Sequence, residues 1–274
     1  MAGLQELRKR LRSVQATGQL SAAMSTAATA KYAKVSRVRG DFDAYAQECE
    51  RMLALLGSRG LPRAAAETAK RDCLVILGGN RGLCGGFNLE LLRFLEDMLS
   101  GAETPPLLIC CGKIASAWLR EKGLAAEEIL LPDVPAYSDV RALSDRLRQV
   151  YDRGEAERVI ALYQHFQNMM VQKPQTAQLL PPPESPAASG EDSVLYLPDR
   201  ESISAQLAEQ CFHARVFSLA LENAAGAQAA TVLAMRSASD NAEKSAAELQ
   251  ITINRRRQAE VTSGVIETAS GAFQ

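Results

Sequence analysis

The 274-residue sequence has few of the side chains on which most catalytic and metal sites depend. It contains one tryptophan, 5% aromatic residues and only two histidines, His165 and His213. Two separated histidines do not favour a zinc site, and they leave a cysteine nucleophile with little choice of base. Both are expected to be structural, His165 in strand-like sequence and His213 in a helix. The sequence therefore predicts no catalytic residues, no metal site and no cofactor.

Charge of one sign and long apolar runs are also absent. The net charge is −1, so no overall field attracts nucleic acid or an anionic membrane. Residues 1–40 carry eight basic side chains against one acid, but no aromatic residue precedes Tyr32 to stack on bases. No stretch approaches the roughly 20 apolar residues that span a bilayer, and no secretory signal opens the chain. We expect no nucleic acid partner and no bilayer insertion.

The six cysteines show no CxxC spacing. Without an export signal they are expected to be reduced thiols. These features predict a cytosolic protein, or one at the cytosolic face of a membrane.

Proline is missing from both ends of the chain. All eleven prolines lie between Pro62 and Pro198. Since an interior proline costs a helix about 3 kcal/mol, residues 1–61 and 199–274 permit very long helices.

The N-terminal segment has the spacing of a coiled coil. Steps of three and four from Leu4 to Leu56 reach sixteen positions, of which twelve are apolar or aromatic. Several short helices would need breakers, and only Gly18 and Gly40 are candidates. One helix over about residues 3–57 would be roughly 80 Å long.

The C-terminal segment repeats this spacing less cleanly, and a helix over about 201–270 would be roughly 105 Å long. Gly226 and Gly264 are its weak points, at about 1 kcal/mol each relative to alanine. Both helices adjoin the same middle segment, which predicts an antiparallel pair with the C-terminal helix extending about 20 Å or more beyond its partner. The residues at the C-terminal spacing are Val232, Met235, Ala238, Ala242, Ala246, Leu249 and Ile253.

Alternating strand and helix patterns fill the middle of the chain, which predicts a mostly parallel, Rossmann-like sheet. The fold class is therefore α/β: a long antiparallel coiled coil plus a central α/β domain. We expect an N-terminal coiled-coil helix at 1–58, a central domain at 70–199 with a linker at 181–192, and a C-terminal coiled-coil helix at 200–274. The expected strands are 73–77, 107–111, 159–163 and 176–180, and the expected helices are 89–99, a segment through Trp118, and 140–150.

A glycine-rich loop, residues 78–88, follows the first expected strand and opens a helix. That position suits phosphate binding, yet the spacing matches neither GxGxxG nor GxxxxGK[ST]. A structural role for its glycines in a tight turn is favoured. Gly82, Leu83, Cys84, Gly85 and Gly86 are thus interpreted as a structural loop.

Two further segments indicate a partner. Residues 16–30 are almost wholly small, with Leu20 and Met24 the only large apolar residues. Small residues allow close helix packing, and they also leave a smooth outer surface on which Met24 is a deformable contact. Near the other end, Arg255, Arg256 and Arg257 form either a solvated basic face or a set of ligands for acidic loops of a partner.

Residues in both terminal segments and in the glycine-rich loop match one family pattern in order. They are Arg8, Val14-Gln15, Thr17, Ala23-Met24, Lys31, Arg81 to Asn88, Ala234-Met235, Asp240-Asn241-Ala242, Asn254-Arg255, Arg257-Gln258-Ala259, Val261-Thr262, Glu267 and Gly271-Ala272. Through these residues the sequence resembles the gamma subunit of F-type ATP synthases, in a divergent bacterial form. The resemblance covers essentially the whole chain.

Some positions depart from the family pattern. Asn80 replaces the acid before the arginine of the loop, and Gly79 replaces a serine or threonine. Gly226-Ala227 replaces a Ser-Glu pair, Gly264 replaces a glutamate, and Ala22 replaces a basic residue.

The resemblance implies a non-catalytic rotor shaft that couples ion flow to ATP synthesis or hydrolysis. Its implied partners are alpha and beta subunits of the catalytic ring, an epsilon subunit and the membrane c-ring, at the cytoplasmic face of a bacterial membrane. Met24 and Arg255–Arg257 are then expected to contact the catalytic ring, with residues 82–86 supporting the foot. The alternative is a small cytosolic nucleotide-binding enzyme that dimerises through its helices.

Overall fold

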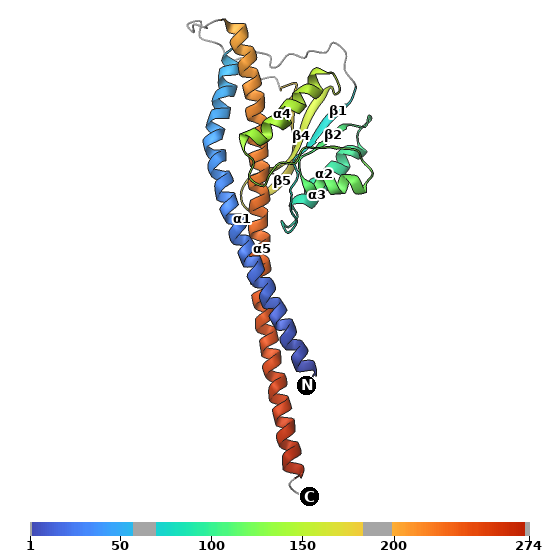
Figure 1. The fold of residues 1–274 in the computed structure, drawn as a ribbon, viewed down its shortest axis with the longest axis vertical. Helices are drawn as coiled ribbons and strands as arrows, with labels where there is room; N and C mark the ends of the chain where they lie inside the picture. The colour runs from blue at the N-terminus through green and yellow to red at the C-terminus, as the bar shows by residue number, and fades with distance from the viewer. Residues whose placement is uncertain (1, 57–69, 183–198, 272–274) are drawn as a thin grey trace. The chain divides into compact units, whose positions relative to one another are not determined.

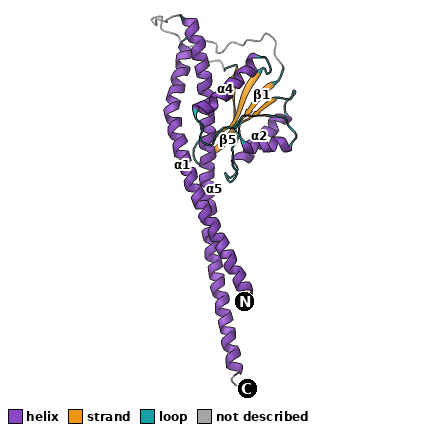
Figure 2. Cartoon of the chain, viewed as in Figure 1, coloured by secondary structure: helices purple, strands orange, loops and turns teal. Residues whose placement is uncertain are grey.

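The computed structural model describes residues 2–56, 70–182 and 199–271 (Figures 1 and 2). It forms two compact units, Met1–Ala27 with Val232–Gln274, and Ala28–Thr231. The elements are α1 (Ala2–Leu55), β1 (Asp72–Ile76), α2 (Phe87–Ser100), β2 (Leu107–Cys110), α3 (Lys113–Glu121), β3 (Glu127–Glu128), α4 (Tyr137–Asp152), β4 (Arg158–Phe166), β5 (Gln172–Leu180) and α5 (Arg200–Gly271).

The two long helices are continuous, as the proline-free ends predict. Neither Gly18 nor Gly40 interrupts α1, and neither Gly226 nor Gly264 interrupts α5. None of the sixteen stripe positions from Leu4 to Leu56, and none of the seven predicted in α5, is exposed. The apolar stripe therefore identifies the buried side of both helices.

In the unit Met1–Ala27 with Val232–Gln274, the helices run antiparallel and approach closely through small residues. The Ser239 hydroxyl donates to the Gly18 carbonyl at 3.3 Å, and the Ser25 hydroxyl donates to the Val232 carbonyl at 3.4 Å. A Cβ on Gly18 would lie 3.1 Å from the Ala242 Cβ. The small-residue segment thus sets the spacing of this helix pair.

In the same unit, α5 continues beyond its partner. Gly3, near the start of α1, faces the Arg256 guanidinium, while α5 runs on to Gly271. The fifteen residues 257–271 would span about 22 Å at 1.5 Å per residue, which agrees with the expected overhang.

The unit Ala28–Thr231 contains a five-stranded sheet of order β3-β2-β1-β4-β5. Its strands are parallel except β5, which pairs antiparallel with β4. The mostly parallel sheet is therefore confirmed. β5 begins at Gln172 rather than 176, because the polar residues at its start gave no strand signal. β4 runs on to Phe166, through the sequence around His165 that was expected to be strand-like.

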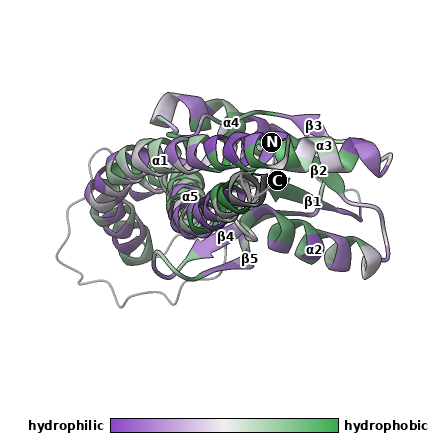
Figure 3. Cartoon of the chain, turned by 90° about the horizontal axis from the view of Figure 1, so that it is seen from below, coloured by the Kyte–Doolittle hydropathy of each residue, from purple (hydrophilic) through white to green (hydrophobic). Residues whose placement is uncertain are grey.

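Each face of this sheet carries its own helices. Residues of one strand point alternately to the two faces, so Leu74 and Ile76 pack with α2 and α3, while Cys73 and Val75 pack with α4, α5 and the second half of α1. Figure 3 shows α2 and α4 on opposite sides of the strands. The core is thus a three-layer arrangement in which α5 is one of the covering helices.

The predicted division into three segments stays a prediction. Most of the predicted linker, residues 183–192, lies outside the described residues.

Replacing Gly40 with alanine is expected to stabilise the protein by about 0.5–1 kcal/mol, because a Cβ there meets nothing within 4 Å and alanine favours the helix. Gly18→Ala is the matched variant, since its Cβ would press against Ala242. Urea unfolding followed by circular dichroism measures both. Equal stabilisation by the two substitutions would contradict the close packing at Gly18.

Candidate functional site

The loop between β1 and α2 is held together by one side chain, that of Asn88. Its Oδ1 accepts the Gly79 N–H at 3.0 Å, and its Nδ2 donates to the Arg81 carbonyl at 3.0 Å and to the Cys84 Sγ at 3.1 Å. Leu83 and Gly85 adopt positive φ angles of 62° and 59°, which allows the tight turn. The loop is therefore a preformed structural unit.

Phosphate binding at this loop is not favoured by its geometry. The N–H of Gly79 already donates to Asn88. Glu90 lies in the first turn of α2, and its Oε1 is 2.9 Å from the position of a Cβ on Gly86. A carboxylate thus already interacts with the positive end of the helix dipole, where a phosphate would bind.

Cys84 is buried against α5 rather than presented to solvent. It forms a small apolar cluster with Phe87 and Ala230, against which Ala227 packs. Burial raises the pKa of its thiol, which lowers its reactivity at neutral pH. The loop thus packs against α5 through Cys84, and the role of residues 82–86 in supporting the foot stays a prediction.

The two histidines contact carboxylates from other parts of the fold. His165, at the end of β4, has its Nδ1 2.6 Å from the Glu222 Oε1. His213 on α5 lies against the Phe212 ring, with its Nε2 3.8 Å from carboxylate oxygens of Asp145 and Glu209. These contacts agree with structural roles.

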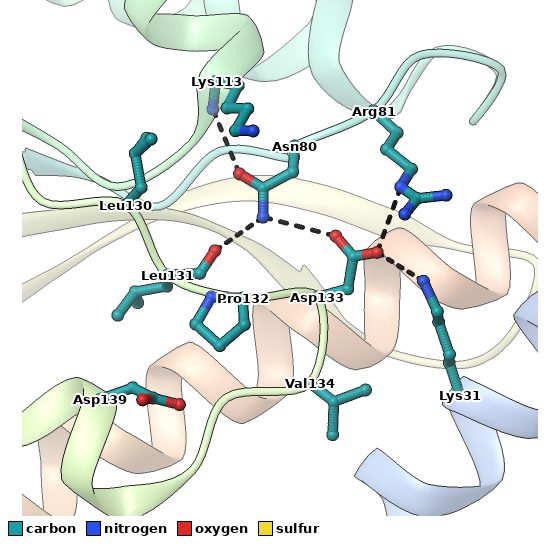
Figure 4. Close-up of a pocket in the computed structure, with 10 residues that line it drawn as sticks. All are labelled: Lys31, Asn80, Arg81, Lys113, Leu130, Leu131, Pro132, Asp133, Val134 and Asp139. Carbon is teal, nitrogen blue, oxygen red and sulfur yellow. Dashed lines mark hydrogen bonds and ion pairs between the residues drawn. The ribbon is translucent and has the colours of Figure 1, made fainter.

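An open recess of about 720 Å³ lies beside the loop, where the carboxyl ends of β1 and β2 meet the segment before α4 (Figure 4). Its centre is Asp133, whose Oδ2 lies 2.6 Å from the Lys31 Nζ and 3.3 Å from the Arg81 Nε. The recess is lined by Lys31, Asn80, Arg81, Lys113, Leu130, Leu131, Pro132, Asp133, Val134 and Asp139.

Asn80 connects the segments around this recess. Its Nδ2 donates to the Leu131 carbonyl at 2.6 Å and to the Asp133 Oδ1 at 3.4 Å, while its Oδ1 accepts the Lys113 N–H at 3.3 Å. An aspartate could not donate either of the first two bonds. The departure at position 80 therefore fits its surroundings, which the sequence alone did not reveal because Asp133 lies 53 residues away.

The charge of Asp133 is stabilised by its neighbours. Burial acts to raise the pKa of its carboxyl group, but Lys31, Asn80 and Arg81 together hold this pKa below its ordinary value of 3.8. The cluster therefore fastens α1 to the α/β part through an ionised carboxylate at neutral pH.

The residues predicted to contact a partner lie on the unit Met1–Ala27 with Val232–Gln274. Met24 is partly buried, whereas the neighbouring Leu20 is 62% exposed. Arg255, Arg256 and Arg257 are all exposed. The structure thus leaves the arginines accessible, and it adds Leu20 as a more accessible apolar side chain than Met24.

Comparisons with known proteins identify the class. A family model described as ATP synthase matches residues 3–273. The ATP synthase gamma chain of Rubrobacter xylanophilus is 30% identical over 99% of this chain and 98% of its own, and that of Granulibacter bethesdensis is 32% identical over 99% of both. Among solved structures, the rotor of Euglena gracilis mitochondrial ATP synthase matches with a TM-score of 0.66 at 18% identity, over 95% of this chain and 99% of that one.

The chain is therefore a subunit of the ATP synthase class. Within that class, it belongs to the ATP synthase gamma chain family. The resemblance drawn from the sequence is confirmed, and the alternative of a nucleotide-binding enzyme is not favoured. Within the residues that the structure describes, no helix is both long and apolar enough to cross a membrane.

Asp133→Asn is expected to lower the free energy of unfolding at pH 7 by about 1 kcal/mol. The expected loss is small because the Lys31 side chain is partly exposed, and solvent weakens its ion pair with Asp133. Because the pKa of Asp133 is lowered in the folded state, its contribution is complete above pH 3.8 and is lost as the pH falls through the folded-state pKa. The difference between wild type and variant should therefore shrink below about pH 4.

Urea titrations at several pH values measure this difference, with Glu121→Gln at an exposed position as control. A difference that stays constant down to pH 2 would show that the charge of Asp133 contributes nothing.

Proposed function

We propose that this chain is the non-catalytic central shaft of a bacterial F-type ATP synthase, positioned at the cytoplasmic face of the membrane. Membership of the gamma chain family supports the assignment of the chain to this complex. The end of α5 that extends beyond α1 supports the role of a shaft. The Asn88 side chain closes the glycine-rich loop with its own hydrogen bonds. In this proposal the nucleotide chemistry belongs to the partner subunits.

The observation that carries this proposal is the apolar surface on the α5 overhang. Val261, Val265 and Ile266 are 61–63% exposed on the part of α5 that continues beyond Gly3 of α1. Exposed apolar side chains gathered on one helix end mark a contact with another protein. A ring of alternating alpha and beta subunits would surround this end.

The partners follow from relatives whose structures contain assemblies. The matched Euglena gracilis and Tetrahymena thermophila structures are described as OSCP/F1/c-ring and central stalk/c-ring, with TM-scores of 0.70 and 0.59. We propose alpha and beta subunits as partners of the helix pair. An epsilon subunit and the c-ring are proposed as partners of the α/β part.

Coupling follows from the asymmetry of the shaft. A helix pair placed off the rotation axis presents a different face to each beta subunit, so each nucleotide site experiences a different contact free energy. Nucleotide affinity must then change with rotor angle, and the linkage is reciprocal. Ion flow that turns the foot releases product, and ATP hydrolysis drives the reverse rotation.

Purification from the native organism tests the proposal directly. The chain is expected to co-purify with alpha and beta subunits and to stimulate their ATPase activity. Tight ATP binding by the isolated chain, without partners, would instead favour an enzyme.

Replacing Arg255, Arg256 and Arg257 together with glutamine is expected to reduce ion pumping per ATP hydrolysed in the assembled complex, because glutamine cannot pair with acidic loops. Protein stability should change by less than about 0.5 kcal/mol, since all three side chains are exposed. Arg236→Gln, at another exposed position of α5, is the control. Unchanged coupling in the triple variant would remove the arginines from the contact surface.

A further inference from the structure

β4 continues past the end of its parallel neighbour β1. The last paired residues are Ile76 and Leu162, and the Leu77 N–H still donates to the Leu162 carbonyl at 2.8 Å. Peptide groups of alternate residues point to the same edge of a strand. The N–H groups of Gln164 and Phe166 therefore point to the edge that β1 has left, where buried donors need other acceptors.

Two adjacent side chains of α5 supply those acceptors. The Asn223 Oδ1 accepts the Gln164 N–H at 3.1 Å, and the Glu222 Oε1 accepts the Phe166 N–H at 2.9 Å. The helix thus replaces the missing strand with side-chain oxygens. We refer to these two bonds as the Glu222–Asn223 contact.

The surroundings make this contact stiff. Glu222 and Asn223 are only 8% and 6% exposed, and Gln164 is fully buried. The Gln164 Nε2 also donates to the Phe87 carbonyl at 2.6 Å, at the start of α2. Hydrogen bonds are strengthened in such a low-dielectric environment, so α5, β4 and α2 are joined at one point.

The remaining contact between α5 and the sheet is mostly apolar, through side chains such as Phe212, Val216 and Leu221. Apolar burial is non-directional, and by itself it resists sliding or turning of a helix only weakly. Hydrogen bonds weaken steeply when their angles change. The directional resistance to rotation of α5 against the sheet is therefore concentrated at the Glu222–Asn223 contact.

We propose that Glu222 and Asn223 are positioning residues that transmit rotation between the α/β part and α5. This inference rests on the proposed function as a shaft. Because α5 is one continuous helix from Arg200 to Gly271, a rotation imposed at residues 222–223 reaches its far end through the helix backbone.

The test compares variants in the assembled complex, reconstituted into vesicles. Glu222→Ala and Asn223→Ala each remove an acceptor, whereas Asn223→Asp keeps an oxygen for the Gln164 N–H. Glu243→Ala, at an exposed position of α5, is the control. Ion pumping and ATP hydrolysis are measured together, and hydrogen exchange follows the amides of residues 164 and 166.

The alanine variants are expected to hydrolyse ATP but lose most of the ions pumped per ATP. Asn223→Asp and Glu243→Ala should retain wild-type pumping. Exchange at the released amide should accelerate on the order of tenfold. Wild-type pumping despite accelerated exchange would overturn the inference, because the contact would then be only structural.

Two further outcomes also have a definite interpretation. If Glu222→Ala does not assemble, Asn223→Ala alone decides, since it leaves the buried carboxylate and its partners in place. If the wild-type chain neither assembles with alpha and beta subunits nor supports pumping, the proposed function fails, and this inference with it. A coupled wild type with equally coupled alanine variants overturns the inference alone.

Discussion

The fold depends on burying one narrow stripe of side chains along each of two very long helices. A helix of this length gains most of its stability from covering its apolar stripe. In the unit Met1–Ala27 with Val232–Gln274 the cover is mutual, and glycine and serine bring the backbones together. In the unit Ala28–Thr231 a sheet with its own helices covers part of the stripe, and Val35 of α1 and Leu221 of α5 enter the sheet's core. The same periodic sequence is thus stabilised by two different kinds of partner.

In the α/β part, α5 occupies the position at which other open α/β sheets bind ligands. In open α/β sheets, ligands bind at the carboxyl ends of the strands, where the strand order reverses. Here the order reverses between β1 and β4, and at that place Asn223 and Glu222 of α5 accept the free N–H groups of β4. Beside it, Asn88 closes the glycine-rich loop. A fold that in other proteins holds nucleotides holds the helix α5 in this one.

Periodic features could be predicted from the sequence, whereas contacts between distant segments could not. The ends of the two long helices lie within two residues of the predicted 3–57 and 201–270, because proline and the three-four spacing act locally. The Glu222–Asn223 contact gave no signal, since its partners lie 56–59 residues away and neither side chain breaks the helical pattern. Asp133 was missed for the same reason. The β4–β5 hairpin was predicted too short, because its polar residues are stabilised by pairing rather than by propensity.

Two of the departures from the family pattern are explained by contacts with residues that are distant in the sequence. Asn80 donates to Leu131 and Asp133, which an aspartate could not do. Gly226 lies where a Cβ would come within 3.1 Å of the Phe87 ring and 3.3 Å of the Gln172 Cγ. The missing side chain lets α5 approach the start of α2 closely, one helical turn from Glu222.

Gly264 differs from these two positions, since a Cβ there would meet nothing within 4 Å. Two of the departures are therefore local solutions to contacts that fasten the long helices to the sheet.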